Sequence, residues 1–383
     1  MDYLLTEEQI ELQKIARRIA NEKLKPVREK YDREDIFPWD MVKVFADAGF
    51  YEIYIPEEYG GIGAGVMELS LVVEELSRIC GGIALAVAAS ALGTFPILIA
   101  GNEEQRQRYL PDLAAGKKLA GFGLTEPNAG SDAGAIRTTA VKNGDYYVLN
   151  GQKCFITNGG NAKIYTIIAS TDPSRGIRGL SAFVVEEGYE GFSYGKFEDK
   201  MGIRASSTCE LIFEDCKVPA ANLIGKEGQG FIVAMKTLDK SRPGVAAQAL
   251  GIAQGALDIA VEYTSQREQF GQSVINFQGI QWMLADMATE IEAARALVYS
   301  TARMIDAGKP NVSKAAAIAK LKASDTAMRV ATDAVQLMGG YGYMKDYPIE
   351  KFMRDAKITQ IYEGTNQIQR VVIAKNIIRE AAS

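Results

Sequence analysis

The stretch NGDYYVLNG, residues 143–151, decides the fold. Asn143-Gly144 is the dipeptide typical of a type I′ hairpin turn, and the residues after it are aromatic and β-branched. Three similar runs follow, separated by Gly, Pro, Asp or Asn: KIYTIIAS (163–170), GLSAFVVEE (179–187) and TCELIFED (208–215). No long helical pattern lies between them. This region therefore predicts an antiparallel sheet or small barrel, and not a parallel doubly wound sheet.

Helical patterns flank this β region on both sides. Before it, Thr6 and Gln9 form a capping box, and helices are predicted over Trp39–Ala48, Val66–Cys80 and Asn102–Leu113. The stretch EEYGGIGAG (57–65) has too many glycines for a helix and predicts a surface turn. It is not a dinucleotide site, because GGIGAG (60–65) lacks the third glycine of that fingerprint. The chain therefore divides into an α-helical region 1–118, a β region 119–228 and an α-helical bundle 229–383.

Two features describe the packing of the third region. Residues recur at steps of four and three along one helix, which predicts a narrow seam for near-parallel packing. The seam residues are Ala317, Leu321, Ser324, Met328, Ala331, Val335 and Met338. Small residues between Val245 and Ala260 predict a second close helix contact.

The residues between Arg78 and Glu103 carry no charge, so this segment is long enough to span a bilayer. It is rich in alanine and contains Gly93 and Pro96, and this favours buried helices joined by a turn. The first residues, MDYLLTEEQ, resemble neither a secretory signal nor a transit peptide, which favours a cytoplasmic protein that does not span a membrane.

Composition excludes several kinds of chemistry. The chain has 383 residues, a net charge of -5 and no histidine, so a Ser-His-Asp triad, a Cys-His dyad and an HExxH zinc site are impossible within it. The charge balance argues against a nucleic-acid binder. The four cysteines form no CxxC pair, which predicts buried thiols in a reducing compartment and no metal site. They are Cys80, Cys154, Cys209 and Cys216.

Four short segments carry polar and glycine residues suited to a ligand site: TEPNAGSD (125–132), FITNGG (155–160), REQFG (267–271) and QIYEGTNQIQR (360–370). Taken singly, each of the first three is explained as well by a turn, a solvated arginine or a core aromatic. In the fourth, Glu363 precedes Gly364 and Thr365, and Tyr362 can shield it from water. Partial burial would raise the pKa of this carboxyl and suit it to general-base catalysis, although a capping or salt-bridged glutamate is the alternative.

Together, and in this order, these segments resemble the acyl-CoA dehydrogenase family. TEPNAGSD is similar to the family's TEPGAGSD, FITNGG to its (W/F)ITNG segment, and EKFMRDAKITQIYEGTNQIQR (350–370) to its carboxy-terminal signature. DKSRPGVAA (239–247) and QREQFG also match, so the resemblance extends from about Leu5 to Arg379. It implies an α+β multidomain fold with an N-terminal α-helical domain, a middle antiparallel β domain and a C-terminal four-helix bundle.

The resemblance also implies one noncovalent FAD per subunit of a homotetramer, a dimer of dimers in which each flavin lies across a dimer interface. The implied contacts within one subunit are Phe122, Leu124, Thr125, Gly130 and Ser131, then Phe155, Ile156 and Thr157, and finally Thr365 and Gln367. The implied contacts to the neighbouring subunit's flavin are Arg267, Phe270, Gln278, Gln336 and Gly340. The implied acyl-CoA contacts are Ser131, Asp239, Lys240, Ser241, Arg242, Tyr362 and Gly364.

The implied reaction is acyl-CoA oxidation to the 2,3-enoyl-CoA in β-oxidation. Glu363 removes the α-proton, hydride passes from the β-carbon to flavin N5, and an electron-transfer flavoprotein reoxidises the cofactor. The thioester carbonyl is expected to bind the Glu363 backbone N–H and a ribityl hydroxyl. Ala84, Ala88 and Ser90 should floor the acyl pocket. Because none is charged, a dicarboxylyl substrate is disfavoured and a short or medium, branched or alicyclic acyl group is expected.

The sequence departs from the family at three flavin-site positions. Phe155 replaces a tryptophan found in many relatives, and Gln269 and Phe277 replace a common Thr and His. Three alternatives stay open: an acyl-CoA oxidase, which usually has a longer chain, a nucleic-acid-associated flavoprotein, which would need a basic carboxy-terminal region, and a non-catalytic acyl-CoA-binding scaffold, against which Glu363 argues.

Overall fold

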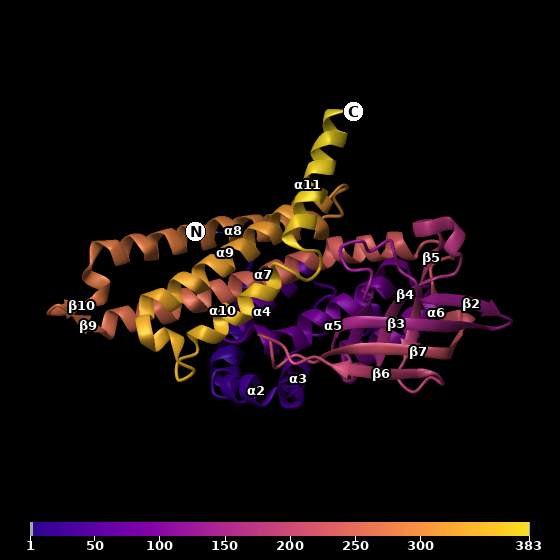
Figure 1. Cartoon of the computed structure of the whole chain (residues 1–383), viewed down its shortest axis with the longest axis horizontal. Coiled ribbons are helices and arrows are strands. Elements are labelled where there is room, and N and C mark those ends of the chain that lie inside the picture. Colours follow the sequence, from indigo (N-terminus) through magenta and orange to yellow (C-terminus); the bar gives the residue numbers. More distant parts are fainter. Residues whose placement is uncertain (1–2, 383) are drawn as a thin grey trace.

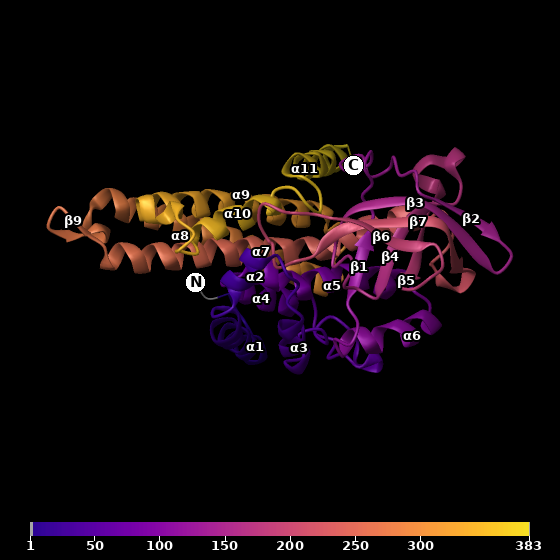
Figure 2. The same cartoon turned by 60° about the horizontal axis from the view of Figure 1, so that its bottom comes forward.

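The computed structural model describes residues 3–382, so Met1, Asp2 and Ser383, at the ends of the first and third predicted regions, lie outside it. The molecule is elongated, with a β-sheet at one end and a long helical bundle at the other (Figure 1). The amino-terminal helices lie along one side of the bundle and reach the sheet (Figure 2). The fold is therefore helical, then β, then helical, as the sequence predicted.

The amino-terminal region consists of α-helices, a π-helical turn (Ala20–Leu24) and one short 3₁₀ turn. Its helices are α1 (Glu7–Ile19), α2 (Arg28–Glu34), α3 (Trp39–Asp47), α4 (Val66–Ser77), α5 (Gly81–Ala100) and α6 (Glu103–Ala114). The predicted capping box at α1 is confirmed, since Gln9 N donates to Thr6 Oγ1 at 3.2 Å and Thr6 N donates to Gln9 Oε1 at 3.1 Å. The glycine-rich stretch 57–65 is not wholly irregular, because Glu57–Tyr59 form the 3₁₀ turn.

The predicted turn inside the uncharged segment is wrong, since α5 is one continuous helix that contains Gly93 and Pro96. A proline removes only one helical hydrogen bond, and packing on all sides holds this helix together. Gly93 is needed for contact with the sheet, since a Cβ there would lie 2.6 Å from Gly121 N. Both α5 and the later helix α7 are apolar enough to cross a membrane, but 72% and 78% of their most apolar windows are buried inside the protein. Both are core helices.

The middle region is an eight-stranded sheet with the order β6-β7-β3-β2-β4-β5-β8, and β1 pairs with β4. Its strands are β1 (Ala120–Gly123), β2 (Thr139–Asn143), β3 (Tyr146–Thr157), β4 (Ile164–Ser170), β5 (Leu180–Glu186), β6 (Phe192–Phe197), β7 (Thr208–Pro219) and β8 (Leu223–Ile224). Most neighbours are antiparallel, as expected. The exceptions are β1 with β4 and a single residue pair between β2 and β4, which are parallel.

The predicted β2–β3 hairpin is present, but its turn type differs. Asn143 pairs with Tyr146, so Gly144 and Asp145 are the central turn residues. The φ angle is +60° at Gly144 and is not positive at Asp145, which is the φ pattern of a type II′ turn. Asn143 therefore belongs to the strand and not to the turn.

The carboxy-terminal region is a four-helix bundle followed by one further helix. The bundle contains α7 (Gly230–Gln266), α8 (Gln278–Asp306), α9 (Ser313–Met338) and the shorter α10 (Ile349–Thr359), while α11 (Asn366–Ala381) projects from the body of the molecule (Figure 1). The predicted close approach on α7 is confirmed, since Cβ atoms at Gly251 and Gly255 would lie 2.2 and 2.1 Å from carbonyl oxygens of Glu74 and Arg78.

The narrow seam predicted on α9 is only half correct. Ala317, Ser324, Ala331 and Met338 are buried, but Leu321, Met328 and Val335 are only partly buried. The helix lies against α7, α8, α10 and α11, so its buried surface is wider than one seam. All four cysteines are buried and free, as expected.

Candidate functional site

Glu363 lies in a tight turn between α10 and α11. Its φ is +51° and that of Gly364 is +93°, so two successive residues are left-handed, a conformation that glutamate adopts only under constraint. Gln369 Nε2 donates to the carbonyl oxygens of Glu363 (3.1 Å) and Gly364 (3.0 Å). Thr365 caps α11 by accepting a bond from Ile368 N at 3.2 Å. The turn is therefore held by side chains that follow it in sequence.

The carboxylate of Glu363 is half-buried against α7. Ser241 Oγ donates to its Oε2 at 2.5 Å. Burial raises the pKa of Glu363, while the Ser241 hydroxyl and the charges of Arg242 and Lys320 oppose that rise. Tyr362, the neighbour predicted to shield it, donates its hydroxyl to Gln248. A carboxyl with a raised pKa, fixed in a constrained turn, has the properties of a general base.

The α7 motif 239–242 is only partly gathered around this carboxylate. Arg242 is 4% exposed, and its Nη1 donates to Asp239 at 2.7 Å. Its Nε has no hydrogen-bond partner in the part of the chain that the structure describes. Lys240 lies elsewhere, with its Nζ 5.0 Å from the centre of the Phe95 ring. The polar residues of α7 on the side of Glu363 are therefore Ser241, which binds its carboxylate, and the ion pair of Arg242 with Asp239.

A buried lysine that the sequence analysis missed contacts the same turn. Lys320, on α9, has no exposed surface, and its Nζ donates to Gly364 O at 2.8 Å and to Asn366 Oδ1 at 3.0 Å. Burial lowers its pKa to about 7. Lysine is a common surface residue, so composition carries no signal for this position.

The two β-region motifs meet at one end of β1 and β3. Cys154 N donates to Thr125 O at 2.9 Å, which brings TEPNAGSD beside FITNGG. Phe155 is left-handed, with φ +58°, and 65% exposed, so an aromatic ring faces outward there. No hydrogen bond among residues 3–382 uses the hydroxyls of Thr125, Ser131 or Thr157. Free hydroxyls and an outward ring suit a large polar aromatic ligand.

A buried ion pair supports these two motifs. Lys153 Nζ donates to Glu126 Oε1 at 2.7 Å and to Leu124 O at 3.1 Å. Burial favours a higher pKa for Glu126, but the Lys153 charge, together with hydrogen bonds from Lys153, Thr138 and the Arg137 N–H, outweighs burial and lowers it. Sequence reasoning missed this pair, because Lys153 lies outside both motifs and 27 residues from Glu126.

The residues predicted to contact the neighbouring subunit's flavin lie at the end of the bundle that is away from the sheet. Arg267 caps the end of α7, and its guanidinium lies 5.8 Å from the centre of the Tyr341 ring. Tyr341 is the residue after Gly340 in the sequence. Phe270 is 94% exposed in the hairpin of β9 (Glu268–Gln269) and β10 (Gln272–Ser273). Gln278 and Gln336 are exposed on neighbouring helices. Both views place this hairpin at the opposite end of the molecule from the sheet (Figures 1 and 2).

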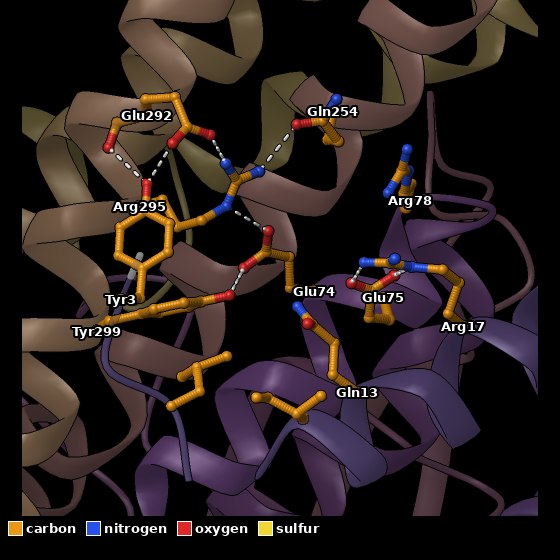
Figure 3. Close-up of a pocket in the computed structure, with 12 residues that line it drawn as sticks. Tyr3, Gln13, Arg17, Glu74, Glu75, Arg78, Gln254, Glu292, Arg295 and Tyr299 are labelled. Atoms are coloured by element: carbon orange, nitrogen blue, oxygen red, sulfur yellow. Dashed lines mark hydrogen bonds and ion pairs between the residues drawn. The ribbon is translucent and has the colours of Figure 1, made fainter. Parts of the chain in front are cut away.

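A further polar cluster lines a cavity of about 450 Å³ between α1, α4, α7 and α8 (Figure 3). Arg295 Nε and the Tyr299 hydroxyl each donate to Glu74 at 2.8 Å, and Arg17 Nη2 donates to Glu75 at 2.6 Å. None of the predicted site residues lines this cavity. It joins the amino-terminal helices to the bundle. Over the described residues, no three His, Cys, Asp or Glu side chains form a metal-binding group.

Three family models match the chain in sequence order. "Acyl-CoA dehydrogenase, N-terminal domain" matches residues 6–117, the middle domain 121–216 and the C-terminal domain 228–378. A relative named acryloyl-CoA reductase (NADH), from Anaerotignum propionicum, is 52% identical over 99% of this chain and 96% of its own length.

Two solved structures are also similar over 99% of this chain and 100% of theirs. The butyryl-CoA dehydrogenase of Megasphaera elsdenii is 50% identical, with a TM-score of 0.96. A structure described as the electron transferring flavoprotein of Acidaminococcus fermentans, in a study of flavin-based electron bifurcation, is 54% identical, with a TM-score of 0.97.

Proposed function

Since the chain belongs to the acyl-CoA dehydrogenase family, we propose that it oxidises a short, uncharged acyl-CoA to the 2,3-enoyl-CoA with Glu363 as the catalytic base. The protein is an FAD-dependent oxidoreductase acting on CH-CH bonds. The assignment of Glu363 as the base rests on one observation. Its carboxylate is half-buried in a constrained turn, and its pKa is raised.

Glu363 has two functional groups that suit this reaction. Its carboxylate removes the α-proton of the thioester, and its raised pKa brings proton affinity closer to neutrality. Its backbone N–H has no hydrogen-bond partner within residues 3–382, so it is available to the thioester carbonyl, where negative charge develops. FAD, when bound, supplies the two-electron oxidation.

The residues around β1 and β3 fit this cofactor. The unpaired hydroxyls of Thr125, Ser131 and Thr157 suit its polar groups, and the outward Phe155 ring suits a flat heteroaromatic system. We expect the cofactor to be held in one subunit by Phe122, Leu124, Thr125, Gly130, Ser131, Phe155, Ile156, Thr157, Thr365 and Gln367. The proposed acyl-CoA contacts remain Ser131, Asp239, Lys240, Ser241, Arg242, Tyr362 and Gly364.

We propose that the flavin site is shared between chains of a homotetramer. The β9–β10 hairpin, which carries Phe270, lies at the end of the molecule opposite the sheet (Figures 1 and 2). Arg267 follows α7, Gln278 begins α8, and Gln336 and Gly340 lie at the end of α9. One chain would therefore not bring both sets of contacts to one cofactor. The apolar side chains of Val371, Ile377 and Ile378 are 44%, 53% and 68% exposed on the projecting helix α11, which suits a subunit interface.

The proposed substrate is narrower than the sequence suggested. Ala84 and Ser90 are buried on α5, and Ser90 Oγ accepts a bond from Ala120 N, so neither side chain offers a charge to a distal carboxylate. Relatives described as butyryl-CoA and short-chain dehydrogenases favour a short straight chain. Nothing supports the branched or alicyclic group.

A cytoplasmic location of the protein and the domain bounds 1–118, 119–228 and 229–383 remain proposals. An electron-transfer flavoprotein accepts the electrons.

The test is anaerobic bleaching of the bound flavin by butyryl-CoA in the wild type, Glu363→Gln and Glu104→Gln. Glu104 is an exposed glutamate on α6 and serves as the control. We expect the wild type and Glu104→Gln to bleach, and Glu363→Gln to bind flavin and substrate without bleaching. Bleaching of Glu363→Gln at the wild-type rate would contradict the assignment.

A second function is the reverse reaction, reduction of a short enoyl-CoA, which the relative named acryloyl-CoA reductase favours. The same carboxyl would then return a proton to the α-carbon. Prereduced enzyme mixed anaerobically with acryloyl-CoA distinguishes the two functions. Rapid reoxidation, together with slow bleaching by acyl-CoA, would favour reduction.

A further inference from the structure

Lys320 is buried in the first third of α9 (Ser313–Met338) and has no ion-pair partner among the described residues. None of the ion pairs among residues 3–382 includes it, and both acceptors of its Nζ, Gly364 O and Asn366 Oδ1, are neutral. Burial of an ammonium without a carboxylate partner is unfavourable, and it lowers the pKa of Lys320 to about 7. A hydrophobic residue would suit this interior better, unless the ammonium serves the turn that it contacts.

Both acceptors belong to the segment that carries the proposed base. Gly364 follows Glu363 directly, and Asn366 begins α11, where its Nδ2 also donates to Asp325 Oδ1 at 2.7 Å. Lys320 therefore connects the first third of α9 to the turn between α10 and α11. Without it, Gly364 O would keep only its bond from Gln369.

The charges of two cations act on the Glu363 carboxylate, and the two differ in their own partners. Arg242, from α7, is paired with Asp239, whereas Lys320, from α9, has no such partner. The charged groups that act on Lys320 are Glu363, Arg242 and Asp325. The Lys320 charge is thus the less compensated of the two, and it acts on the carboxylate through the turn that it also binds.

We propose that Lys320 is a positioning residue for the reaction: it holds the Gly364 carbonyl, fixes the left-handed Glu363–Gly364 turn, and favours the ionised form of the Glu363 carboxylate. This inference rests on the proposed function, because it assigns Lys320 a role through Glu363.

The test uses flavin-loaded Lys320→Met, Lys320→Arg and Lys322→Met. Lys322 lies two residues further along α9 and pairs with Glu290, so it is the matched control. We expect Lys320→Met to lower the bleaching rate constant by roughly 10- to 100-fold with little change in KM. The acidic limb of its pH–rate profile should move upward by roughly one unit, because removal of a nearby cation raises the pKa of Glu363. Lys320→Arg should return the acidic limb of the pH–rate profile to its wild-type position.

A second measurement is independent of turnover. Amide hydrogen exchange of peptides covering residues 360–367 should be faster in Lys320→Met than in the wild type and Lys322→Met. If Lys320→Met does not yield flavin-loaded protein, Lys320→Gln, which keeps a donor without the charge, takes its place and should show the same shift of the acidic limb.

The outcomes separate the two proposals. An unchanged limb and unchanged exchange in the Lys320 variant, with normal bleaching in the wild type and Lys322→Met, overturn the role of Lys320 alone. Failure of the wild type to bleach with any acyl-CoA, or to be reoxidised by an enoyl-CoA, overturns the proposed function and this inference with it. A shifted limb and faster exchange confined to Lys320→Met support the inference.

Discussion

The molecule contains two buried glutamate–lysine sites that use the same residue types differently. In the β region, Lys153 pairs directly with Glu126 and the pKa of that carboxyl is lowered. At the α10–α11 turn, Lys320 binds a backbone carbonyl, and the pKa of Glu363 is raised. A cation in direct contact with a carboxylate outweighs the effect of burial and lowers its pKa, whereas the charges of Arg242 and Lys320 only oppose the rise that burial causes at Glu363.

The largest expected effect is on stability at the β-region pair. Glu126→Ala leaves the Lys153 ammonium buried with Leu124 O as its remaining partner, so the free energy of unfolding should fall by roughly 3 to 5 kcal/mol. Urea denaturation measures this loss. The double variant Glu126→Ala/Lys153→Met should be less destabilised than Glu126→Ala, and equal losses would show that the pair is not coupled.

The next effect is on catalysis at the turn. Glu363→Asp withdraws the carboxylate by one methylene, and the bleaching rate constant should fall roughly 100-fold while flavin binding is kept. Stopped-flow absorbance under anaerobic conditions measures it. A fall of less than about threefold would mean that the turn does not fix the position of the base.

A smaller effect is expected at the helix cap that ends the turn. Thr365→Ala removes the acceptor of the Ile368 N–H and should cost about 1 kcal/mol of unfolding free energy. Thr365→Ser, which keeps the hydroxyl, is the control for thermal unfolding. Equal melting temperatures of the alanine variant and the wild type would contradict the capping role.

The smallest effect separates the two carboxyls by the sign of their pH dependence. The folded pKa of Glu363 is raised, so its contribution to stability is present at low pH and is lost as pH rises through that pKa. The folded pKa of Glu126 is lowered, so its contribution is present above the unfolded pKa and is lost as pH falls through the folded one. Glu363→Gln should therefore be more stable than the wild type at pH 8, and Glu126→Gln less stable. Opposite signs in calorimetry would refute the contrast.

Local signals predicted the parts of the fold that depend on neighbouring residues. The capping box at Thr6 and the β2–β3 hairpin follow from residues three apart or less. The continuity of α5 through Pro96 could not be predicted, because it depends on packing from distant elements, including the close approach of Gly93 to β1. The motif of Glu363 was found for the same local reason, as a carboxylate beside a glycine and a capping threonine.

The supporting lysines had no such signal. Lys153 lies 27 residues from Glu126, and Lys320 lies 44 residues from Gly364, so only the folded chain shows that either is buried and what it binds.

Helix α7 has 37 residues and is therefore about 55 Å long. It begins next to the sheet and ends at the hairpin of Phe270, so its length separates the two sets of proposed flavin contacts. Under the proposed sharing of the cofactor between copies, dilution that separates the copies would also release the flavin, and the loss of yellow colour would report the dissociation constant of the assembly.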